Sequence, residues 1–245
     1  MDLALTSTAT ELQVSTTSNG VEICDIATNP QTCLAGESLA SDSEVRSYLN
    51  SLTTVSELDF ALATIAGEVH ASFRSVMIGE GERRSDMVIR RLASAFPASS
   101  EDPSAYGLAL GNGAAVEGGW WASAYGERSD IDATTLTAAL DTQLYGWLIG
   151  VDGNFDNGWN GGIVGGNSNN KATLDAVLSQ SKSNTWSLGA YGGGEVEQVG
   201  LRLGAFYNWH SVDADRTAVV GVLQQSLTAS YDAKSWQAFA EAGYE

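Results

Sequence analysis

The stretch YGWLIGVDGNFDNGWNGGIVGG, residues 145–166, decides the fold of this chain. It holds too many glycines for a helix and too many large aromatic residues for a linker. From 145 to 155 the odd positions are apolar apart from one glycine, whereas the even positions are mostly small or polar. This two-residue period is that of a β-strand with one apolar face. The DNG sequence at 156–158 then predicts a hairpin turn, after which a second strand begins at Trp159.

The same alternation recurs along the chain and predicts an antiparallel sheet. The expected strands are residues 119–126, 142–155, 159–169, 184–196, 200–212 and 229–244. Their connections alternate between long polar segments (127–141, 170–183 and 213–228) and short turns (156–158 and 197–199). All the long connections then lie on one side of an up-and-down sheet. This asymmetry is typical of outer-membrane barrels, which have short periplasmic turns and long external loops.

Aromatic residues gather near the ends of the expected strands. Two belts of aromatic rings are typical of a protein that crosses both interfaces of a membrane. The residues expected near the short turns are Trp120, Phe155, Trp159 and Tyr244. The residues expected near the long loops are Tyr125, Tyr145, Trp186, Trp209 and Tyr231. A soluble sandwich, in which the apolar face fills a core, is the alternative that alternation alone leaves open.

The charge balance of the chain argues against one class of binding partner, nucleic acids. The chain has 30 acidic and 12 basic residues, for a formal net charge of −18. Nucleic-acid binding needs cations that neutralise phosphates, so we expect no nucleic-acid partner. No run of about 18 apolar residues occurs, so no transmembrane helix is predicted. The start, MDLALTSTATELQ, has neither a basic segment nor an apolar one and is not a signal peptide.

Neither an enzyme nor a metal site is expected. The chain has two histidines, His70 and His210, too far apart in sequence to suggest a catalytic triad, and it lacks a G-x-S-x-G motif. DGNFDNG at 152–158 begins like a calcium loop. It has Asn157 where glycine is required and Ile163 where the bidentate glutamate belongs. We therefore predict no catalytic residues and no cofactor.

Residues 1–52 are polar and rich in serine and threonine, and they hold both cysteines of the chain, Cys24 and Cys33. A zinc site needs about four ligands, and the two histidines are far away in sequence. The spacing in CDIATNPQTC instead favours a small disulfide loop formed in an oxidising compartment. Two unpaired thiols are the alternative.

Residues 57–92 are expected to form a helix. Apolar residues recur at the three- and four-residue spacing of one helix face, at Leu58, Leu62, Ile65 and Val69. We expect Gly79 and Gly81 to break or kink this helix, and Pro97 and Pro103 to end it.

Basic side chains cluster on the same helix, in an otherwise acidic chain. Two arginine pairs recur seven residues apart and a fifth arginine lies upstream; these residues are Arg74, Arg83, Arg84, Arg90 and Arg91. Taken alone, the cluster is equally well explained by a solvated basic face.

Five stretches, in order along the chain, resemble the translocator domain of classical bacterial autotransporters. They are WWASAYG (120–126), the stretch at 145–166, WSLGAYGG (186–193), LRLGAFYNWHSVDADR (201–216) and YDAKSWQAFAEAGYE (231–245). Upstream, LDFALATIAGEVHASF (58–73) resembles the linker that precedes that barrel. The resemblance covers about residues 45–245.

This resemblance implies a fold and a mechanism. The family's barrel is a pore of roughly twelve strands in the outer membrane. A helical linker lies in the pore and joins the barrel to a passenger exported to the cell surface. The expected fold is mainly β: an antiparallel up-and-down transmembrane β-barrel, about six of twelve strands, preceded by an α-helical linker. The expected domains are a C-terminal remnant of the passenger (1–52), a pore-spanning helical linker (53–96), a connector (97–117) and a partial autotransporter β-barrel (118–245).

The resemblance also implies that the arginine-rich helix lies inside the pore. Arg74, Arg83 and Arg84 are expected to face a pore lumen lined by acids, since buried charges need partners. The side chains expected to face the lumen are Asp152, Asn154, Arg202, Asn208, His210 and Glu241. Arg202 and Glu241 lie on neighbouring strands, so we expect them to pair.

The expected function is that of an outer-membrane translocator that exports an N-terminal passenger and anchors it at the bacterial cell surface. Its expected partners are outer-membrane lipid, the barrel assembly machinery and its own passenger. Alternatives are an anchor for a surface adhesin, a passenger that is a hydrolase, a porin-like channel, and a soluble antiparallel β-sheet binding domain.

Two departures from the family pattern add further expectations. Six strands leave two open edges, and the chain stops at GYE without the aromatic end that the assembly machinery reads, so we expect a fragment that cannot close a pore alone. Some family members cleave the passenger at paired asparagines in the helix. No such pair lies in 57–92, so we expect no cleavage of that kind.

Overall fold

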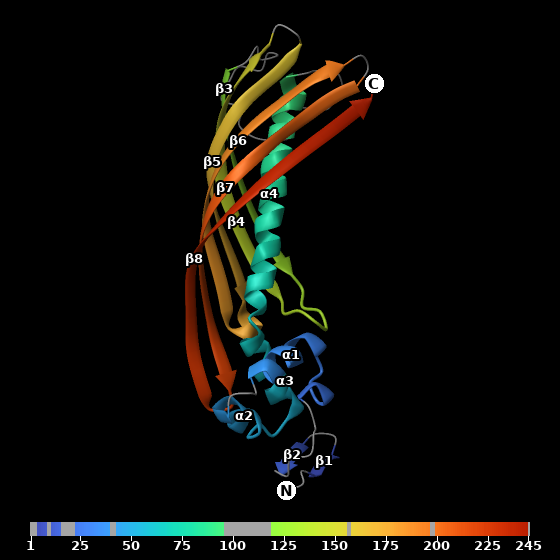
Figure 1. The fold of residues 1–245 in the computed structure, drawn as a ribbon, viewed down its shortest axis with the longest axis vertical. Helices are drawn as coiled ribbons and strands as arrows, with labels where there is room; N and C mark the ends of the chain where they lie inside the picture. The colour runs from blue at the N-terminus through green and yellow to red at the C-terminus, as the bar shows by residue number, and fades with distance from the viewer. Residues whose placement is uncertain are drawn as a thin grey trace.

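The computed structural model describes residues 4–8, 11–15, 23–39, 43–95, 119–155, 158–196 and 199–244. Its largest feature is a curved antiparallel sheet whose six strands pair in chain order (Figure 1). The strands are β3 (Gly119–Ile131), β4 (Leu140–Asn154), β5 (Trp159–Leu174), β6 (Ser179–Val196), β7 (Val199–Val220) and β8 (Leu223–Tyr244). The predicted order, a helical segment followed by six up-and-down strands, is confirmed.

The strands extend further than their composition predicts. The segments expected as long loops, 127–141, 170–183 and 213–228, each contain β structure at both ends. β5 and β6 are joined through a short 3-10 helix, η3 (Asp175–Val177), and β7 and β8 through residues 221–222. Ladder hydrogen bonds do not require an apolar face, so a hairpin that projects into water can carry polar side chains on both faces. Composition therefore indicated where the apolar strip ends, and not where the strands end.

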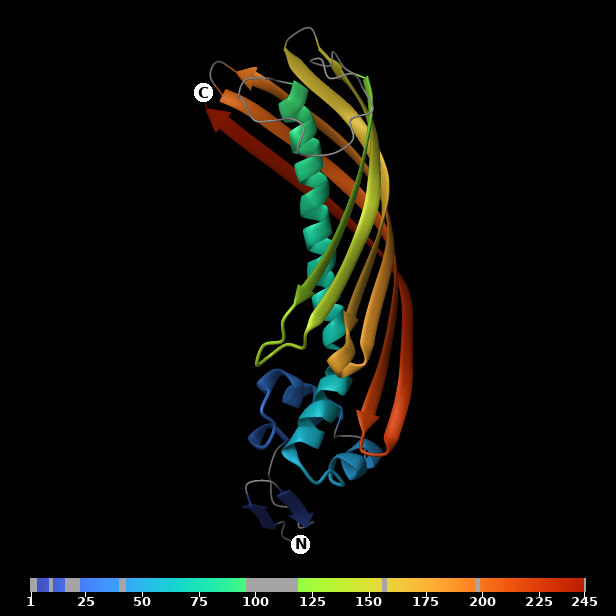
Figure 2. The same cartoon turned by 180° about the vertical axis from the view of Figure 1, so that it is seen from behind.

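The N-terminal part is helical, apart from a hairpin of β1 (Ala4–Thr8) and β2 (Glu11–Ser15). The short helices η1 (Ile23–Asp25), α1 (Pro30–Leu39), α2 (Ser43–Leu49) and α3 (Val55–Ala66) gather at the end of the sheet where β7 turns into β8 (Figure 1). The longest helix, α4 (Glu68–Ala95), runs along the concave face of the sheet in both Figure 1 and Figure 2. No helix in the described ranges is long and apolar enough to cross a membrane.

The break between α3 and α4 falls at Gly67. Gly67 adopts φ 69° and ψ 35°, the left-handed conformation that glycine accepts without the steric cost of a Cβ atom. α3 itself begins with a capping box: Thr54 Oγ1 accepts from the Glu57 N–H at 3.2 Å, and Glu57 Oε2 accepts from the Thr54 N–H at 3.1 Å. The sequence predicts one helix over 57–92, whereas the structure has two helices, α3 and α4, separated by Gly67.

The expectation that Gly79 and Gly81 would break the helix is wrong, because α4 is continuous through both residues. A Cβ atom at Gly81 would lie 2.5 Å from the Oε1 atom of Gln237 on β8. The end of the Gln237 side chain thus occupies the space that a Cβ atom at position 81 would take. Glycine inside a helix costs only about 1 kcal/mol relative to alanine, so two glycines do not suffice to end a 28-residue helix. Pro97 and Pro103, which were expected to end the helix, lie outside the described residues.

We call η1, α1, α2 and α3 together the cap. A disulfide joins Cys24 to Cys33 within it. The cap has one apolar core, to which the end of β7 also contributes, and its buried members are Cys33, Leu49, Leu52, Leu58, Ala61, Leu62, Ile65 and Val220. The expected domain division between residues 52 and 53 therefore falls inside one packed unit. The expected connector, 97–117, lies outside the described residues.

Polar contacts attach the cap to two places on the sheet. Asn29 Nδ2 donates to the carbonyl of Leu136, in the connection between β3 and β4, at 3.1 Å. On β7, Arg216 Nη1 donates to the carbonyl of Ile65 at 2.7 Å, which satisfies an acceptor in the last turn of α3. The cap thus spans from one hairpin end of the sheet to another.

Candidate functional site

The candidate site is the surface between α4 and the sheet. Alternate residues of each strand point toward α4, and we call this side the inner face: even positions in β4, β5 and β7, and odd positions in β3, β6 and β8. The contacts between α4 and this face fall into three zones along the helix. Two zones are apolar and lie at the two ends, and the zone between them is polar.

The zone nearest the cap is apolar. Val69 and Phe73 of α4 are buried there against residues from four parts of the sheet. We call this group the cap-end cluster; its buried members are Val69, Phe73, Leu140, Ala172, Leu174, Val177 and Val212. A second apolar zone lies near the other end of α4, where Val88 and Leu92 are buried. We call it the turn-end cluster; its buried members are Val88, Leu92, Trp121, Leu148, Val164, Tyr191 and Phe206.

Between the clusters lies a buried ion pair within α4. Glu80 and Arg84 are one helical turn apart, and their side chains are 0% and 2% exposed. Glu80 accepts hydrogen bonds from Arg84 Nη1, from the hydroxyl of Ser168 and, at 2.6 Å, from Nδ2 of Asn170. The carboxylate therefore meets both its own helix and strand β5. A buried carboxylate is tolerated only with such partners.

The polar zone continues onto β6, β7 and β8. His210 is buried and contacts two hydroxyls: Thr185 Oγ1 lies 2.9 Å from its Nδ1 and Ser235 Oγ lies 2.8 Å from its Nε2. Asn208 Nδ2 donates to the same Ser235 hydroxyl at 3.2 Å. We call Glu80, Arg84 and these inner-face polar residues the polar belt; its strand members are Ser168, Asn170, Ser181, Ser183, Thr185, Asn208 and His210.

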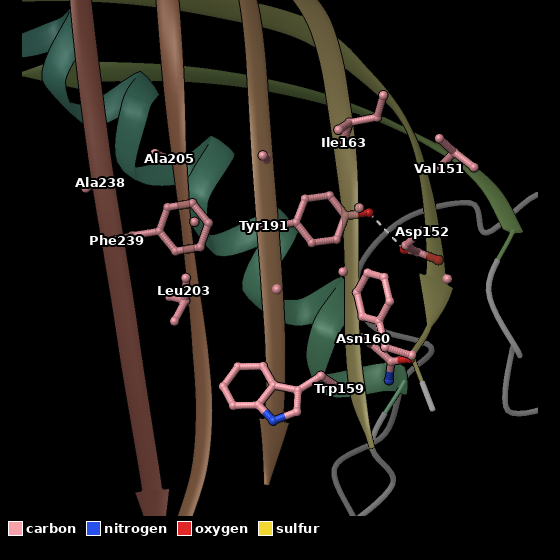
Figure 3. Close-up of a pocket in the computed structure, with 17 residues that line it drawn as sticks. Val151, Asp152, Trp159, Asn160, Ile163, Tyr191, Leu203, Ala205, Ala238 and Phe239 are labelled. Carbon is pink, nitrogen blue, oxygen red and sulfur yellow. Dashed lines mark hydrogen bonds between the residues drawn. The ribbon is translucent and has the colours of Figure 1, made fainter. Parts of the chain in front are cut away.

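A second ion pair joins α4 to β4 beside the turn-end cluster. Arg91 donates from Nε and Nη2 to the two carboxylate oxygens of Asp152, both at 2.8 Å. This two-pronged geometry is the strong arrangement for arginine and carboxylate. Asp152 also accepts from the Tyr191 hydroxyl at 2.8 Å (Figure 3), and that hydroxyl accepts from Trp121 Nε1 at 2.6 Å. The chain of contacts connects α4 to β4, β6 and β3.

The other expected helix cations lie elsewhere. Arg83 is half-exposed and pairs with Glu127 of β3. Arg74 and Arg90 are exposed. The sequence associated Asp152 with the earlier arginines, whereas Arg91 is the residue that reaches it, because strand register and helix rotation decide which pairs meet.

The residues expected to face the lumen all lie at inner-face positions. Asp152, Asn208 and His210 are in the contacts described above. Arg202 pairs with Glu241 on the neighbouring strand. Asn154 is exposed, at the end of β4.

Sequence reasoning missed the central members of the site, Glu80, Ser168 and Asn170. Two signals for them were present. Glu80 and Arg84 stand at the four-residue spacing of a helix ion pair. Strand β5 carries polar residues at even positions in NSNNK, 167–171, the same parity that faces inward at Val164.

The opposite, outer face of the sheet is apolar and bears most of the expected interface aromatics. Exposed rings there include Trp120, Tyr145, Phe155, Trp186 and Trp209. Tyr231 is also exposed, but it is paired with Val212 and lies at an inner-face position of β8. Trp186 and Trp209 are register partners, and Trp186 meets Trp147 edge-on with ring centroids 6.0 Å apart. Tyr125 differs from the expectation, because it lies on the inner face beside the turn-end cluster. The side chain of Tyr244 lies outside the described residues.

A shallow apolar groove marks the outer face near the short turns. Small residues of four adjacent strands, such as Gly161, Gly192, Ala205 and Ala238, form its floor. Ile163, Leu203 and Trp159 stand around it, with α4 behind the strands (Figure 3). Its polar neighbours, Asp152 and Tyr191, are directed toward each other. The groove offers apolar surface without a set of reactive groups.

Comparison with known proteins agrees with this geometry. Residues 120–245, just over half of the chain, match the family described as autotransporter beta-domain. Two proteins from Serratia marcescens, both named extracellular serine protease, are 27% identical over 194 residues and 28% identical over 199 residues. Each alignment covers 79% of this chain but only 18% of the relative. The chain therefore spans about a fifth of the length of the curated relatives that it matches.

Proposed function

The chain belongs to the autotransporter beta-domain family, and from this premise we propose that its inner face is the path along which a passenger segment leaves the cell, with α4 retained there as the last part of that segment. The domain is an outer-membrane translocator, and its location is the bacterial outer membrane. The Serratia relatives are named for a protease, but the present chain matches only 18% of their length, and the part matched by the family model is the beta-domain.

The observation that supports this proposal is the seating of α4 on the concave inner face. The helix is 28 residues long, or about 42 Å at 1.5 Å per residue, which is enough to cross a bilayer including its headgroup regions. Its contacts with the sheet are partly polar and buried, as expected for a pore that water fills before the helix enters. The outer face, with its exposed aromatic rings and apolar groove, is suited to contact with outer-membrane lipid.

The orientation follows from the ends of α4. Its first turn lies at the cap, together with the β3–β4, β5–β6 and β7–β8 connections, and its last turn lies near the short turns. The hairpins at the cap end continue beyond the apolar strip as polar strands, and in outer-membrane barrels the longer connections face outward and the shorter ones face the periplasm. The cap is therefore placed at the cell surface, where an N-terminal passenger would continue outward. The barrel assembly machinery is proposed as the partner that inserts the strands, on the strength of family membership.

The edges of the sheet support a larger assembly in the membrane. Among the described residues, β3 and β8 each pair on one side only. Lipid offers no hydrogen bonds to the unpaired edge of a strand, so both edges need further strands in the bilayer. Mispairing of these edges is a problem that assembly machinery solves.

Cysteine labelling on intact Gram-negative cells tests the orientation. Val222, at the β7–β8 turn, is 94% exposed, and Asn154 is exposed at the opposite end of the sheet. In the full-length protein, Val222→Cys should react with a membrane-impermeant maleimide on intact cells, and Asn154→Cys only after the outer membrane is permeabilised. The two cysteines of this chain are paired with each other, and the full-length protein without either substitution serves as the labelling control. The reverse labelling pattern, or labelling of neither site in a membrane fraction, would refute the proposal.

We also propose that the passenger of the whole protein is a serine protease. The support is the similarity to two relatives that carry this name, over 79% of the present chain. The test is proteolysis of casein by cells that express the whole protein, with and without a serine-directed inhibitor. Inhibitor-sensitive proteolysis would support this activity. Binding to host cells or matrix without proteolysis would favour an adhesive passenger.

A further inference from the structure

We propose that α4 comes to rest at one depth along the inner face because apolar and polar zones of the helix match the zones of the sheet. This inference rests on the proposed function, in which α4 travels along that face before it stops. The match concerns the position of the helix along its own axis. It therefore determines which residue of the chain reaches the cell surface.

The zones on α4 follow each other at intervals of about two to three turns. Val69 and Phe73 are apolar and buried, and Glu80 and Arg84 are charged and buried. Val88 and Leu92, farther along, are again apolar and buried. One stripe of the helix thus reads apolar, charged, apolar.

The sheet presents the same order on its inner face, and β5 shows it most fully. Val164 belongs to the turn-end cluster. Ser168 and Asn170, farther along the strand, belong to the polar belt. Ala172 and Leu174 then belong to the cap-end cluster. The strand therefore reads apolar, polar, apolar, as the helix does.

Two further strands agree on where the polar belt lies. β7 runs parallel to β5 and repeats its order, with Phe206 in the turn-end cluster, His210 in the belt and Val212 in the cap-end cluster. β6 runs the opposite way, and Thr185 in the belt precedes Tyr191 in the turn-end cluster. The belt is therefore a property of the whole inner face and not of one strand.

A slide of one helical turn breaks this match in either direction. If α4 moves toward the short turns, Arg84 enters the place of Val88, inside the turn-end cluster. A charged group there is buried in apolar surroundings without its partners. If α4 moves toward the cap, Val88 enters the polar belt in place of Arg84. Glu80 then leaves Ser168 and Asn170 without their acceptor.

The polar belt already contains buried polar atoms without a hydrogen-bond partner, and a slide that brings apolar side chains over it would add to their number. Among the described residues, three buried oxygens of the belt already lack a protein hydrogen-bond partner: Asn170 Oδ1, Asn208 Oδ1 and Ser181 Oγ. Ordered water is the usual partner of such atoms. An apolar turn of α4 placed over the belt would cover further polar groups, which makes the observed position the single favourable one within reach of a one-turn slide.

The depth of α4 is measurable by spin labels on the full-length protein in lipid nanodiscs. Ser75 is exposed on the side of α4 away from the sheet, and Asn154 is exposed at the end of β4. With nitroxides at Ser75→Cys and Asn154→Cys, pulsed electron resonance should give one narrow distance. A slide of one turn changes the axial separation by about 6 Å, because each residue adds 1.5 Å.

Two double variants test whether the belt sets the depth. E80L/R84L makes the stripe apolar throughout, and we expect the distance distribution to broaden or split by about 6 Å. The matched control, E82L/D86L, changes two carboxylates one turn apart on the exposed side and should keep the narrow distance. E80Q/R84Q leaves the polar belt polar but uncharged, and we expect this variant to keep the narrow distance as well. A narrow wild-type distance in E80L/R84L, or a broad one in E80Q/R84Q, would overturn the inference.

A third variant moves the charged zone instead of removing it. V76E/E80R/R84V shifts the pair by one turn toward the cap along the sequence. The new carboxylate then fits the belt only if α4 slides toward the short turns, so the measured distance should shorten by about 6 Å. An unchanged distance contradicts the inference even if E80L/R84L does not assemble. If all variants behave as expected but Val222→Cys stays unlabelled on intact cells, the proposed function fails and the depth rule for α4 stands.

Discussion

Helices α3 and α4 are adjacent in the chain, separated only by Gly67, yet they are held by different kinds of contact. α3 packs through the apolar core of the cap, and α4 packs through two apolar clusters with a charged zone between them. Apolar burial is strong but does not depend on direction, so it tolerates small slides. Buried charges permit few positions. The apolar core of the cap therefore contributes mainly to stability, whereas the buried charges of α4 determine where the helix lies along the sheet.

The largest expected effect is a loss of stability where α4 packs on the sheet. Arg84→Met leaves Glu80 buried without its cation, and we expect a loss of about 3–5 kcal/mol in the stability of the α4–sheet interface. Arg83→Met, one residue away and half-exposed, should cost less than about 1 kcal/mol. Chemical unfolding of the full-length protein in detergent measures both. Equal effects of the two substitutions would show that the buried pair has no special part in holding α4.

The next largest effect is a loss of stability in the apolar core of the cap, to which α3 contributes Leu62. Leu62 is 0% exposed in the core of the cap, and Leu62→Ala should cost about 3 kcal/mol through lost burial and the cavity left behind. Leu34→Ala is the matched control, since Leu34 is 64% exposed. Hydrogen exchange should rise across residues 43–66 and stay unchanged in the middle of α4. An increase of hydrogen exchange in both regions would show that the cap and α4 do not depend on separate contacts.

Removal of the disulfide should weaken the cap and leave the depth of α4 unchanged. The bond closes a loop over a sequence separation of 9, and the Cys24→Ser/Cys33→Ser variant should lose about 2–3 kcal/mol of cap stability by giving the unfolded segment more freedom. Because α4 has its own contacts with the sheet, the depth measured between labels on Ser75 and Asn154 should not change. Reduction of the wild-type protein should reproduce the effect, with hydrogen exchange as the common measurement.

The smallest expected effect concerns the start of α3 and depends on pH. The backbone N–H and the hydroxyl of Thr53, followed by the backbone N–H of Thr54, bind the Glu57 carboxylate and lower its pKa below the ordinary value of 4.5. The folded state thus favours the charged form. Its stabilising contribution is full above the unfolded pKa and is lost as the pH falls through the lowered folded pKa. Glu57→Gln should remove this acid-side dependence in thermal unfolding, and Glu82→Gln should not.

The sequence predicted the strands well because their two-residue alternation is a local consequence of having one apolar face. It also placed Asp152, Asn208 and His210 on the face that turned out to cover α4. It failed at the ends of the strands, where polar hairpins continue beyond the apolar strip. It also put the break in the helix at Gly79 and Gly81, because a glycine inside a continuous helix looks the same in sequence as one that ends a helix.

Three features follow from the amino-acid sequence alone: the parity of each strand, the order of the strands and the presence of a helix rich in arginine. Each of these depends on residues close together in the chain. The contacts of Glu80 with Ser168 and Asn170, and of Arg91 with Asp152, emerge only when the chain folds. Such pairs depend on the strand register and on the rotation and depth of α4. These quantities are set by contacts between segments about 60 to 90 residues apart, which no local pattern encodes.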